Sequence, residues 1–315
     1  MNFRPDLTTL RMFLAVYRQG NMTKAAEREH IAPSAISKRI QDLELEIGTP
    51  LFYRHARGMT ATPAGEALAR HTAGRGRGHA AGMGAELSVF SAGEEGQARL
   101  HAHQSAVVQH LPQELAAFRE AYPKIKIVLR EETSPNVIQS MQDGLGDIGI
   151  FAEHSPLPEG LEIYEYKRDP LVALVPVSHP LAACRSLTLP EIAGHDFISL
   201  ETGSSLQVLL AHSAAEAGID IAYRIEVVTF TAAVQMVEYG FGITIVPAGI
   251  ARIYCSNDKV AAVPFSDSWA QRRLMICTRD EPKLTAAAKL LLRHLRSPDA
   301  RPLHLPAAKG SLPNR

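Results

Sequence analysis

The feature that most limits how this chain can fold is an amphipathic segment that begins at Pro33. Its apolar residues recur every three or four positions, which places them on one face of a helix: Ile36, Ile40, Leu43 and Ile47. Proline suits the first position of a helix, where its missing N–H has no intrahelical partner to lose. The other face carries short hydroxyls and long cations, so this helix has one packed side and one polar, basic side.

Two shorter helices are predicted ahead of this segment. The first has its own apolar stripe at helical spacing, formed by Leu7, Leu10, Phe13, Leu14 and Tyr17. Asp6 can cap its start, and Gly20-Asn21 can end it. The second is expected to begin at Thr23, whose hydroxyl can act as a cap, and to end near Glu29-His30. Two helices joined by a short turn, of which the second is polar, are typical of the helix-turn-helix that reads the DNA major groove.

The stretch after the polar helix predicts a two-stranded wing. Leu51 and Phe52 are expected to anchor it in the core, while Arg54 and Arg57 point toward a phosphate backbone. Thr62-Pro63 then begins another helix, with the threonine as its cap. The same elements also suit an ordinary helical bundle whose polar face is simply solvated, so this pattern leaves both interpretations open.

Charge is unevenly distributed, although the formal net charge of the 315 residues is +0. Residues 1–75 hold 11 Lys and Arg against 7 Asp and Glu, and the remainder holds 22 against 26. An N-terminal region with excess positive charge, followed by a region with excess negative charge, favours a nucleic-acid contact at the N-terminal end.

Residues 1–65 resemble the DNA-binding domain of the LysR-type transcriptional regulator family. The resemblance rests on Met22-Thr23-Lys24-Ala25-Ala26-Glu27, Ile31-Ala32-Pro33-Ser34-Ala35-Ile36-Ser37-Lys38-Arg39-Ile40, Leu43-Glu44, Ile47-Gly48, Leu51-Phe52, Arg54, Arg57 and Thr62-Pro63-Ala64-Gly65. It implies a winged helix-turn-helix that binds double-stranded DNA. The residues that enter the major groove would be Ser34, Ser37, Lys38 and Arg39. The residues that contact phosphates would be Thr23, Arg54 and Arg57, and the same surface would include Lys24 and Pro33. Ala32 departs from the family, which usually has a capping hydroxyl there.

The connecting segment, residues 66–96, is unusual for this family. The resemblance implies a linker helix that pairs two subunits, but five glycines fall between Gly74 and Gly84. Each costs about 1 kcal/mol against alanine inside a helix, so we expect residues 71–84 to be the least stable helical segment. Three interpretations remain open: dimer packing keeps the helix, the helix breaks into a flexible hinge, or a local change of reading frame has replaced a normal helix.

Residues 97–297 predict alternating strands and helices, which is an α/β pattern with a parallel sheet in its first part. Strands are expected at 98–102, 124–131, 147–151, 171–177, 197–200, 223–228 and 272–277. Helices are expected from Ser105 or Val107 to Tyr122, and at 135–143, 205–217, 230–239 and 283–296. The Pro-rich end, residues 298–315, is expected to be disordered.

Residues 97–296 also resemble the effector domain of the same family, which is built from two α/β lobes like a periplasmic solute-binding protein. The shared pieces are Leu111-Pro112, Phe118, Tyr122-Pro123, Gly146-Asp147-Ile148-Gly149-Ile150, His179-Pro180-Leu181 and Gly240-Phe241-Gly242-Ile243-Thr244-Ile245-Val246-Pro247. The resemblance implies a cleft between the lobes that binds a small-molecule effector.

Hydroxyls and free N–H groups at helix starts predict where that effector binds, because helix N-termini attract anions. The candidate positions are Gln104 and Ser105, then Thr202, Gly203 and Ser204, and by the family resemblance Thr231 and Gly242. A small carboxylate is the expected ligand. The alternative is that Ser105 and Ser204 are ordinary helix caps.

The sequence offers no grouping typical of an enzyme. Ser204 lacks the flanking pattern of a nucleophile elbow, and neither a P-loop nor a dinucleotide fingerprint occurs. His101 and His103 share a strand face but have no third ligand at metal spacing. Cys184, Cys255 and Cys277 are too few and too scattered for a disulfide framework. We therefore expect no catalytic residues, no cofactor and no metal.

The expected partners follow from this interpretation. They are double-stranded DNA, a small-molecule effector, a second copy paired through the linker helix, a homotetramer of two such dimers, and RNA polymerase. Without a signal peptide or an apolar run of about 18 residues, the chain is expected to be cytoplasmic, with no membrane contact. Two alternatives stay open: an architectural DNA-binding protein that senses nothing, and a solute-binding protein or enzyme on the two-lobed fold.

Overall fold

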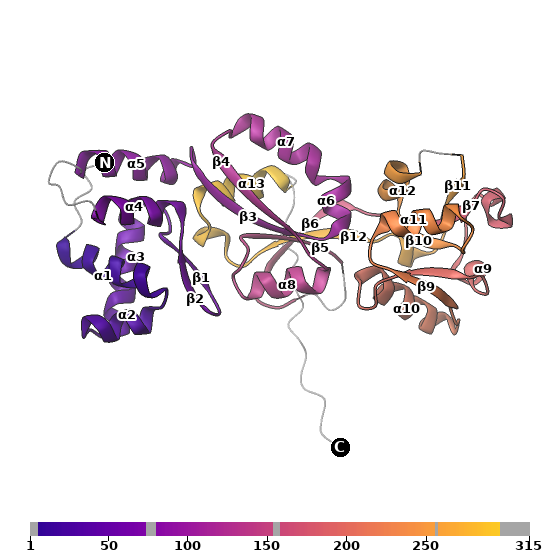
Figure 1. The fold of residues 1–315 in the computed structure, drawn as a ribbon, viewed down its shortest axis with the longest axis horizontal. Coiled ribbons are helices and arrows are strands. Elements are labelled where there is room, and N and C mark those ends of the chain that lie inside the picture. The colour runs from indigo at the N-terminus through magenta and orange to yellow at the C-terminus, as the bar shows by residue number, and fades with distance from the viewer. Residues whose placement is uncertain (1–5, 74–79, 154–157, 256–257, 297–315) are drawn as a thin grey trace, which may run out of the picture. The chain divides into compact units, whose positions relative to one another are not determined.

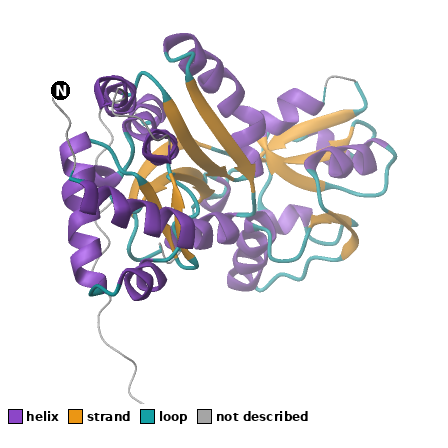
Figure 2. Cartoon of the chain, turned by 60° about the vertical axis from the view of Figure 1, so that its left-hand side comes forward, coloured by secondary structure: helices purple, strands orange, loops and turns teal. Residues whose placement is uncertain are grey.

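A computed structural model of the chain describes residues 6–73, 80–153, 158–255 and 258–296 (Figure 1). These residues form two compact units. Among the described residues, unit 1 contains those up to Phe151 together with Thr278–Leu295, and unit 2 contains those between Ala152 and Cys277 together with Arg296. The tail expected at 298–315 and the centre of the glycine-rich stretch, residues 74–79, lie outside the described residues. Strands and helices occur in both units (Figure 2), as the α/β prediction requires.

The N-terminal part of unit 1 begins with the three predicted helices. They are α1 (Leu7–Gln19), α2 (Met22–Glu29) and α3 (Pro33–Ile47). Asp6 caps α1 by accepting the N–H of Thr9 at 2.8 Å, and Gly20 ends it in the left-handed conformation. The prediction that Thr23 caps α2 is wrong. Asn21 does so instead, because its amide oxygen accepts the N–H groups of Thr23 and Lys24 at 2.9 and 3.1 Å.

The wing follows α3 as two antiparallel strands, β1 (Phe52–His55) and β2 (Gly58–Ala61), in which Phe52 pairs with Ala61. The helices and the wing close over one apolar core. Its largest fully buried members are Phe13, Ile36, Ile40, Leu43, Ile47, Leu51 and Leu68. The apolar stripe of α3 and the anchor residues of the wing are therefore confirmed as core, and the polar face of α3 is left on the outside.

The linker consists of two helices, α4 (Pro63–Ala73) and α5 (Ala80–Ala92). Arg70 and His71 both contact Glu86, at 2.9 and 2.6 Å. In one continuous helix, residues 16 positions apart would be separated by about 24 Å. The linker is therefore broken, and α5 lies alongside α4 with Met83 and Leu87 buried in the helix-turn-helix core. Of the three interpretations left open, the one that keeps a single continuous helix does not fit these contacts within the chain.

The rest of unit 1 is the first part of the effector domain. Its strands are β3 (Gly96–Ala102), β4 (Ile125–Glu131) and β5 (Ile148–Ala152), and β3 lies between the other two and runs parallel to both. Its helices are α6 (Gln104–Gln109), α7 (Leu111–Ala121), α8 (Ser134–Gln142) and α13 (Ala286–Leu295).

The helix predicted from about residue 105 to Tyr122 is in fact two helices, α6 and α7. His110 between them leaves the helical conformation, with φ −121° and ψ −48°. Pro112 explains the break, because a proline cannot donate to the carbonyl four residues earlier and its ring collides with that carbonyl.

Unit 2 holds the second lobe, with strands β7 (Leu171–Pro176), β8 (Phe197–Leu200), β9 (Tyr223–Val227), β10 (Thr244–Pro247) and β11 (Val260–Pro264). The unit also includes β6 (Glu162–Arg168) and most of β12 (Arg273–Thr278), which belong to the five-stranded sheet of order β4-β3-β5-β12-β6. Its helices are α9 (Leu189–Ile192), α10 (Ser205–Ala217), α11 (Phe230–Glu238) and α12 (Ala248–Tyr254), with short 3₁₀ turns at Pro180–Ala183 and Ser268–Ala270; a third, Glu281–Lys283, precedes α13 in unit 1. β7 pairs antiparallel with β10 and β11, while β8 and β9 are parallel. Sequence analysis did not assign strands at β6, β10 or β11. No helix among the described residues is long and apolar enough to cross a membrane.

Candidate nucleic-acid interface and effector-binding positions

The polar face of α3 presents the residues expected in the major groove. Ser34 and Lys38 are exposed, and Ser37 is half-buried. These three positions follow helical spacing, so their side chains lie on one face, opposite the buried Ile36 and Ile40. The described residues form no ion pair with Lys38, which leaves its ammonium group available to an external phosphate or base edge.

Arg39 differs from its neighbours because it already has partners within the protein. Its Nη1 donates to Asp6 Oδ2 at 3.3 Å and to Thr9 Oγ1 at 3.1 Å. These contacts tie α3 to the N-terminal cap of α1. The hydrogen bonds from Thr9, and to a smaller extent the charge of Arg39, hold the pKa of the Asp6 carboxyl below its usual value.

Glu44 positions the wing, a role that sequence reasoning missed. Its Oε1 accepts the backbone N–H groups of Leu51 and Phe52 at 2.8 and 3.3 Å, and its Oε2 lies 3.6 Å from Nη2 of Arg54. Burial raises the pKa of this carboxyl, and the hydrogen bonds and Arg54 offset the rise in part. The only sequence signal for this role was that the Leu43-Glu44 dipeptide, part of the family resemblance, lies shortly before the wing.

Thr23, Lys24, Pro33 and Arg57 are all exposed. The first two belong to the first turn of α2, where the helix dipole favours an anion, although Asn21 already accepts their backbone N–H groups. Arg57 belongs to the turn between β1 and β2, and the described residues form no ion pair with it. The exposed Thr23 hydroxyl is not used for capping, so it too can serve an external phosphate.

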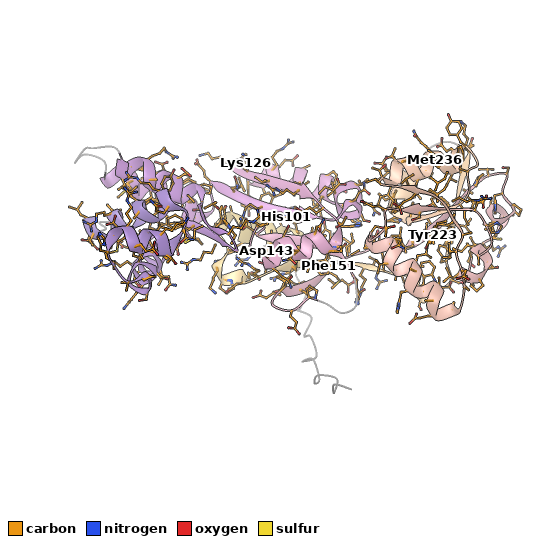
Figure 3. The ribbon with its side chains drawn as sticks, turned by 60° about the horizontal axis from the view of Figure 1, so that its bottom comes forward. His101, Lys126, Asp143, Phe151, Tyr223 and Met236 are labelled. Carbon is orange, nitrogen blue, oxygen red and sulfur yellow. The ribbon has the colours of Figure 1, made fainter. Side chains whose placement is uncertain are left out.

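In unit 1, the effector-binding candidates Gln104 and Ser105 open α6. The cap of this helix is His103, whose Nδ1 accepts the N–H of Ser105 at 3.2 Å, so Ser105 is not the cap. Ser105 is fully buried. His101 also turns inward, at the carboxyl end of β3 (Figure 3), where its Nδ1 lies 3.1 Å from Glu132 Oε2. The two histidines thus have separate partners, and the described residues contain no group of three potential metal ligands.

In unit 2, Thr202, Gly203 and Ser204 lie together before α10. Ser204 caps this helix by accepting the N–H of Gln207 at 3.3 Å, so its capping role is confirmed. Thr202 donates to Glu226 Oε2 at 2.7 Å. Thr231 is exposed in the first turn of α11, where Thr229 is the cap.

Gly242 has a structural reason to be glycine. Its φ is +146°, and a Cβ at this position would lie 2.2 Å from the carbonyl oxygen of Asp196. An L side chain fits neither the backbone conformation nor the space.

Comparison with known proteins identifies both halves of this arrangement. Residues 7–66 match the model of the bacterial regulatory helix-turn-helix protein of the lysR family, and residues 91–298 match the LysR substrate binding domain. The chain belongs to the LysR family. It is a DNA-binding transcription regulator with an effector-binding domain.

Relatives of this LysR-family regulator are themselves named as transcription regulators. The Hca operon transcriptional activator HcaR of Escherichia coli K12 is 30% identical over 270 residues, which cover 82% of this chain and 86% of the relative. The regulator AlsR of Bacillus subtilis 168 is 29% identical over 253 residues, covering 79% and 82%.

Solved structures support the fold. Full-length CbnR complexed with its target DNA aligns with a TM-score of 0.57 and 23% identity, covering 92% of this chain and 98% of that one. A full-length OxyR variant from Pseudomonas aeruginosa aligns with a TM-score of 0.61 and 18% identity, covering 93% and 100%. LysR regulators of this architecture bind DNA and effectors and form oligomers.

Proposed function

We propose that this LysR-family regulator binds its operator by inserting the polar face of α3 into the major groove. The observation that carries the proposal is the exposed Ser34–Lys38 face of a helix whose opposite side is locked in the core. Hydroxyls and an ammonium group at this spacing can reach base edges and phosphates. Pro33 starts the helix and presents this face.

Phosphate contacts are assigned to the flanks of α3. The side chains that can contact the DNA phosphate backbone are a hydroxyl and three cations, all exposed. They are Thr23 and Lys24 at the start of α2, and Arg54 and Arg57 in the wing. Arg39 is the weakest member of the set, because DNA would have to compete with Asp6 and Thr9 for its guanidinium.

We propose a small carboxylate as the effector, with the start of α10 as its main anchor. That helix is long, and the loop before it supplies the Thr202 and Ser204 hydroxyls together with the backbone of Gly203. Gln104 and Ser105 at α6, and Thr231 at α11, are the secondary candidates. Gly242 contributes through its backbone, since a side chain does not fit there.

We further propose that the regulator acts as a homodimer, that dimers pair into a homotetramer, and that the assembled protein contacts RNA polymerase. Two recognition helices in a dimer would meet half-sites about one helical turn apart or a multiple of it. Met83 and Leu87 of α5 are used in the chain's own core, so the exposed side of the α4–α5 pair would supply the linker's share of a dimer contact.

A matched pair of lysine substitutions tests the DNA proposal. Fluorescence anisotropy with fragments flanking the protein's own gene would compare Lys38→Ala with Lys126→Ala, which removes an exposed lysine on β4 (Figure 3). Lys38→Ala should weaken binding and reduce the salt slope by about one phosphate contact, whereas Lys126→Ala should change neither. Equal effects, or folded wild-type protein that binds none of these fragments at modest salt, would overturn the proposal.

A further inference from the structure

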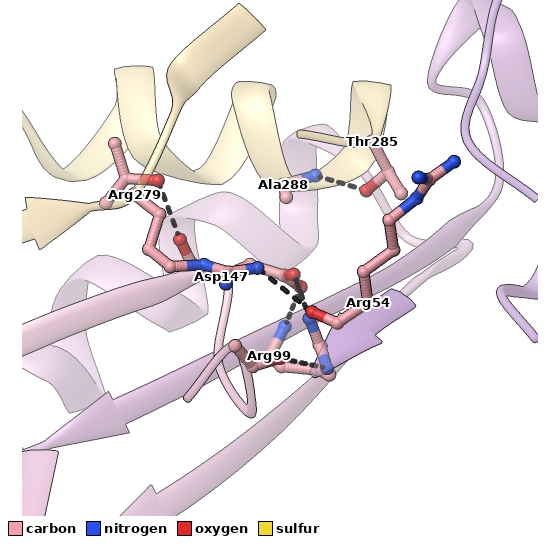
Figure 4. A network of polar contacts seen from close by, with 8 residues as sticks. Arg54, Arg99, Asp147, Arg279, Thr285 and Ala288 are labelled. Atoms are coloured by element: carbon pink, nitrogen blue, oxygen red, sulfur yellow. Dashed lines mark hydrogen bonds and ion pairs between the residues drawn. The ribbon is translucent and has the colours of Figure 1, made fainter. Parts of the chain in front are cut away.

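The wing of the DNA-binding domain is held by the effector domain within unit 1. We call this the wing contact and define it by Tyr53, Arg54 and Ala56 on the wing side and by Arg99, Asp143 and Arg279 on the effector-domain side. The guanidinium carbon of Arg99 lies 3.6 Å from the centre of the Tyr53 ring. The N–H of Ala56 donates to the carbonyl of Asp143 at 3.0 Å. Nη2 of Arg279 donates to the carbonyl of Arg54 at 3.1 Å (Figure 4).

Asp147 holds Arg99 in place on the effector-domain side of the wing contact. Asp147, which is nearly buried, binds Arg99 three times: Nη2 at 2.6 Å, Nε at 3.2 Å and the backbone N–H at 2.8 Å (Figure 4). These bonds aim the guanidinium at the ring of Tyr53, where a cation and an aromatic face attract each other.

Gly144 makes room for the wing backbone. A Cβ at residue 144 would stand 2.4 Å from the carbonyl oxygen of Arg54 and 2.6 Å from Nη2 of Arg279, and its φ of +76° also favours glycine. The loop is thus shaped to admit the wing.

Two polar atoms of the docked wing have no hydrogen-bond partner among the described residues. Tyr53 Oη and His55 Nδ1 are buried and have no hydrogen bond among the described residues. Burial raises the pKa of the Tyr53 hydroxyl accordingly. Buried polar atoms without partners are costly, and release of the wing would return both to water. The docked wing is therefore held by specific bonds, but the buried polar atoms without partners reduce the stability of the docked state.

DNA and the effector domain would compete for the same part of the wing. Ala56 and the neighbouring Arg57 lie at the turn between β1 and β2, which is the part of a wing that approaches the duplex. In the docked state the N–H of Ala56 is bonded to the carbonyl of Asp143, just beyond the carbonyl end of α8, so a duplex that approaches this end of the turn has to displace the effector domain.

We propose that the wing contact is an autoinhibitory clasp: the effector domain holds the wing in a state that binds DNA poorly, and release of the wing restores binding. This inference rests on the proposed DNA-binding function. The apparent affinity for DNA then falls in proportion to the fraction of molecules in which the wing is free.

A reversible cross-link tests the clasp directly. Ala56→Cys with Asp143→Cys joins the two sides, and the two single-cysteine variants are the controls. The double variant should form an intramolecular disulfide, lose DNA affinity by about 100-fold or more when oxidised, and recover when reduced. Failure of the pair to cross-link, or full DNA affinity in the cross-linked protein, would overturn the clasp.

A second pair of variants keeps the test independent of any introduced cysteine. Arg279→Ala removes the bond to the wing, while Lys283→Ala removes an exposed cation nearby that bonds only to Asp280 among the described residues. Arg279→Ala should tighten DNA binding by about fivefold to tenfold and Lys283→Ala should not. Equal affinities of these variants and wild type contradict the clasp, whereas loss of DNA binding in all of them, wild type included, contradicts the DNA proposal instead.

Discussion

Arg272 and Asp169 form an ion pair that is almost wholly buried in unit 2. Nη2 of Arg272 lies 2.6 Å from Asp169 Oδ2, Nε lies 2.9 Å from the same oxygen, and the two side chains are 4% and 0% exposed. The backbone N–H of Asp169 also donates to the carbonyl of Arg272 at 3.0 Å. The pair fastens the start of β12 to the residue that follows β6.

Removing one partner of this pair leaves a buried charge uncompensated. Asp169→Ala should lower the free energy of unfolding by about 3–5 kcal/mol, and joint replacement by Asp169→Leu and Arg272→Met should recover most of the loss. Arg224→Ala, which breaks an exposed pair with Asp196 in the same unit, should cost at most about 1 kcal/mol. Urea unfolding of the full chain measures all three, and a loss for Asp169→Ala no larger than for Arg224→Ala contradicts the prediction.

Glu44 should make stability depend on pH in an unusual direction. Its pKa is raised by burial, so the folded state keeps a proton that the unfolded chain releases above the ordinary value of 4.5. Between the two pKa values the folded state binds more protons, and stability therefore falls as pH rises through that window. As the pH rises between the two pKa values, the melting temperature of the wild type should fall relative to that of Glu44→Gln. The glutamine does not titrate, and it keeps an acceptor for the Leu51 N–H. Parallel pH curves for the two proteins would show that Glu44 is not the source.

Two glycines of one loop allow the stability cost of an unfavourable backbone conformation to be compared with the cost of a steric clash. Gly242→Ala places a Cβ 2.2 Å from the carbonyl oxygen of Asp196 and should cost about 3 kcal/mol or more. Gly240→Ala meets nothing within 4 Å at a φ of +75° and should cost only about 1 kcal/mol. Chemical denaturation of the two variants tests this, and similar losses would mean that the contact with Asp196 relaxes freely.

The two-helix linker should be less protected than the recognition helix. The described part of α5 contains Gly82 and Gly84, each costing about 1 kcal/mol within a helix. Hydrogen exchange should therefore be faster over residues 80–86 than over α3. Glu86→Ala, which removes the partner of Arg70 and His71, should speed it further, while Ser88→Ala on the same helix should not. Protection equal to that of α3 would contradict the expectation.

A pair of helix caps can separate effector binding from stability. Ser204→Ala and Thr229→Ala each remove a side-chain cap, at a cost of about 1 kcal/mol. A carboxylate that binds at the start of α10 should raise the melting temperature of wild type and Thr229→Ala, but raise that of Ser204→Ala much less. DNA affinity should stay unchanged in both variants. The same response in all three proteins would remove Ser204 from the effector site.

The helix-turn-helix could be predicted closely because its signals are local. The apolar period of α3, the proline at its start and the glycine after α1 each act within a few residues, and the structure follows them. The cap of α2 was assigned to Thr23 rather than Asn21 because both residue types cap helices. Only the actual backbone conformation of Asn21, extended at φ −152°, decides between them.

The roles of individual residues in the DNA-binding site were less clearly indicated by the sequence than the helices were. The sequence placed Ser34 and Lys38 on one polar face with Arg39 at its side, but it could not show that Arg39 reaches Asp6. Lys38, by contrast, has no ion-pair partner among the described residues. That difference depends on how α1 packs across α3. The break at His110 was within reach of sequence reasoning, since Pro112 was visible, but the apolar period on either side of it favoured one helix.

By itself, the order of residues along the chain determined the family, the helix-turn-helix and the alternation of strands and helices, because these depend on propensities and spacings within short stretches. Tertiary structure alone decided that α5 turns back on α4 through Glu86, that Glu44 holds the wing, and that Tyr53 lies under Arg99. Each of these joins groups far apart in sequence, and whether they meet depends on the packing of the whole unit rather than on any local preference.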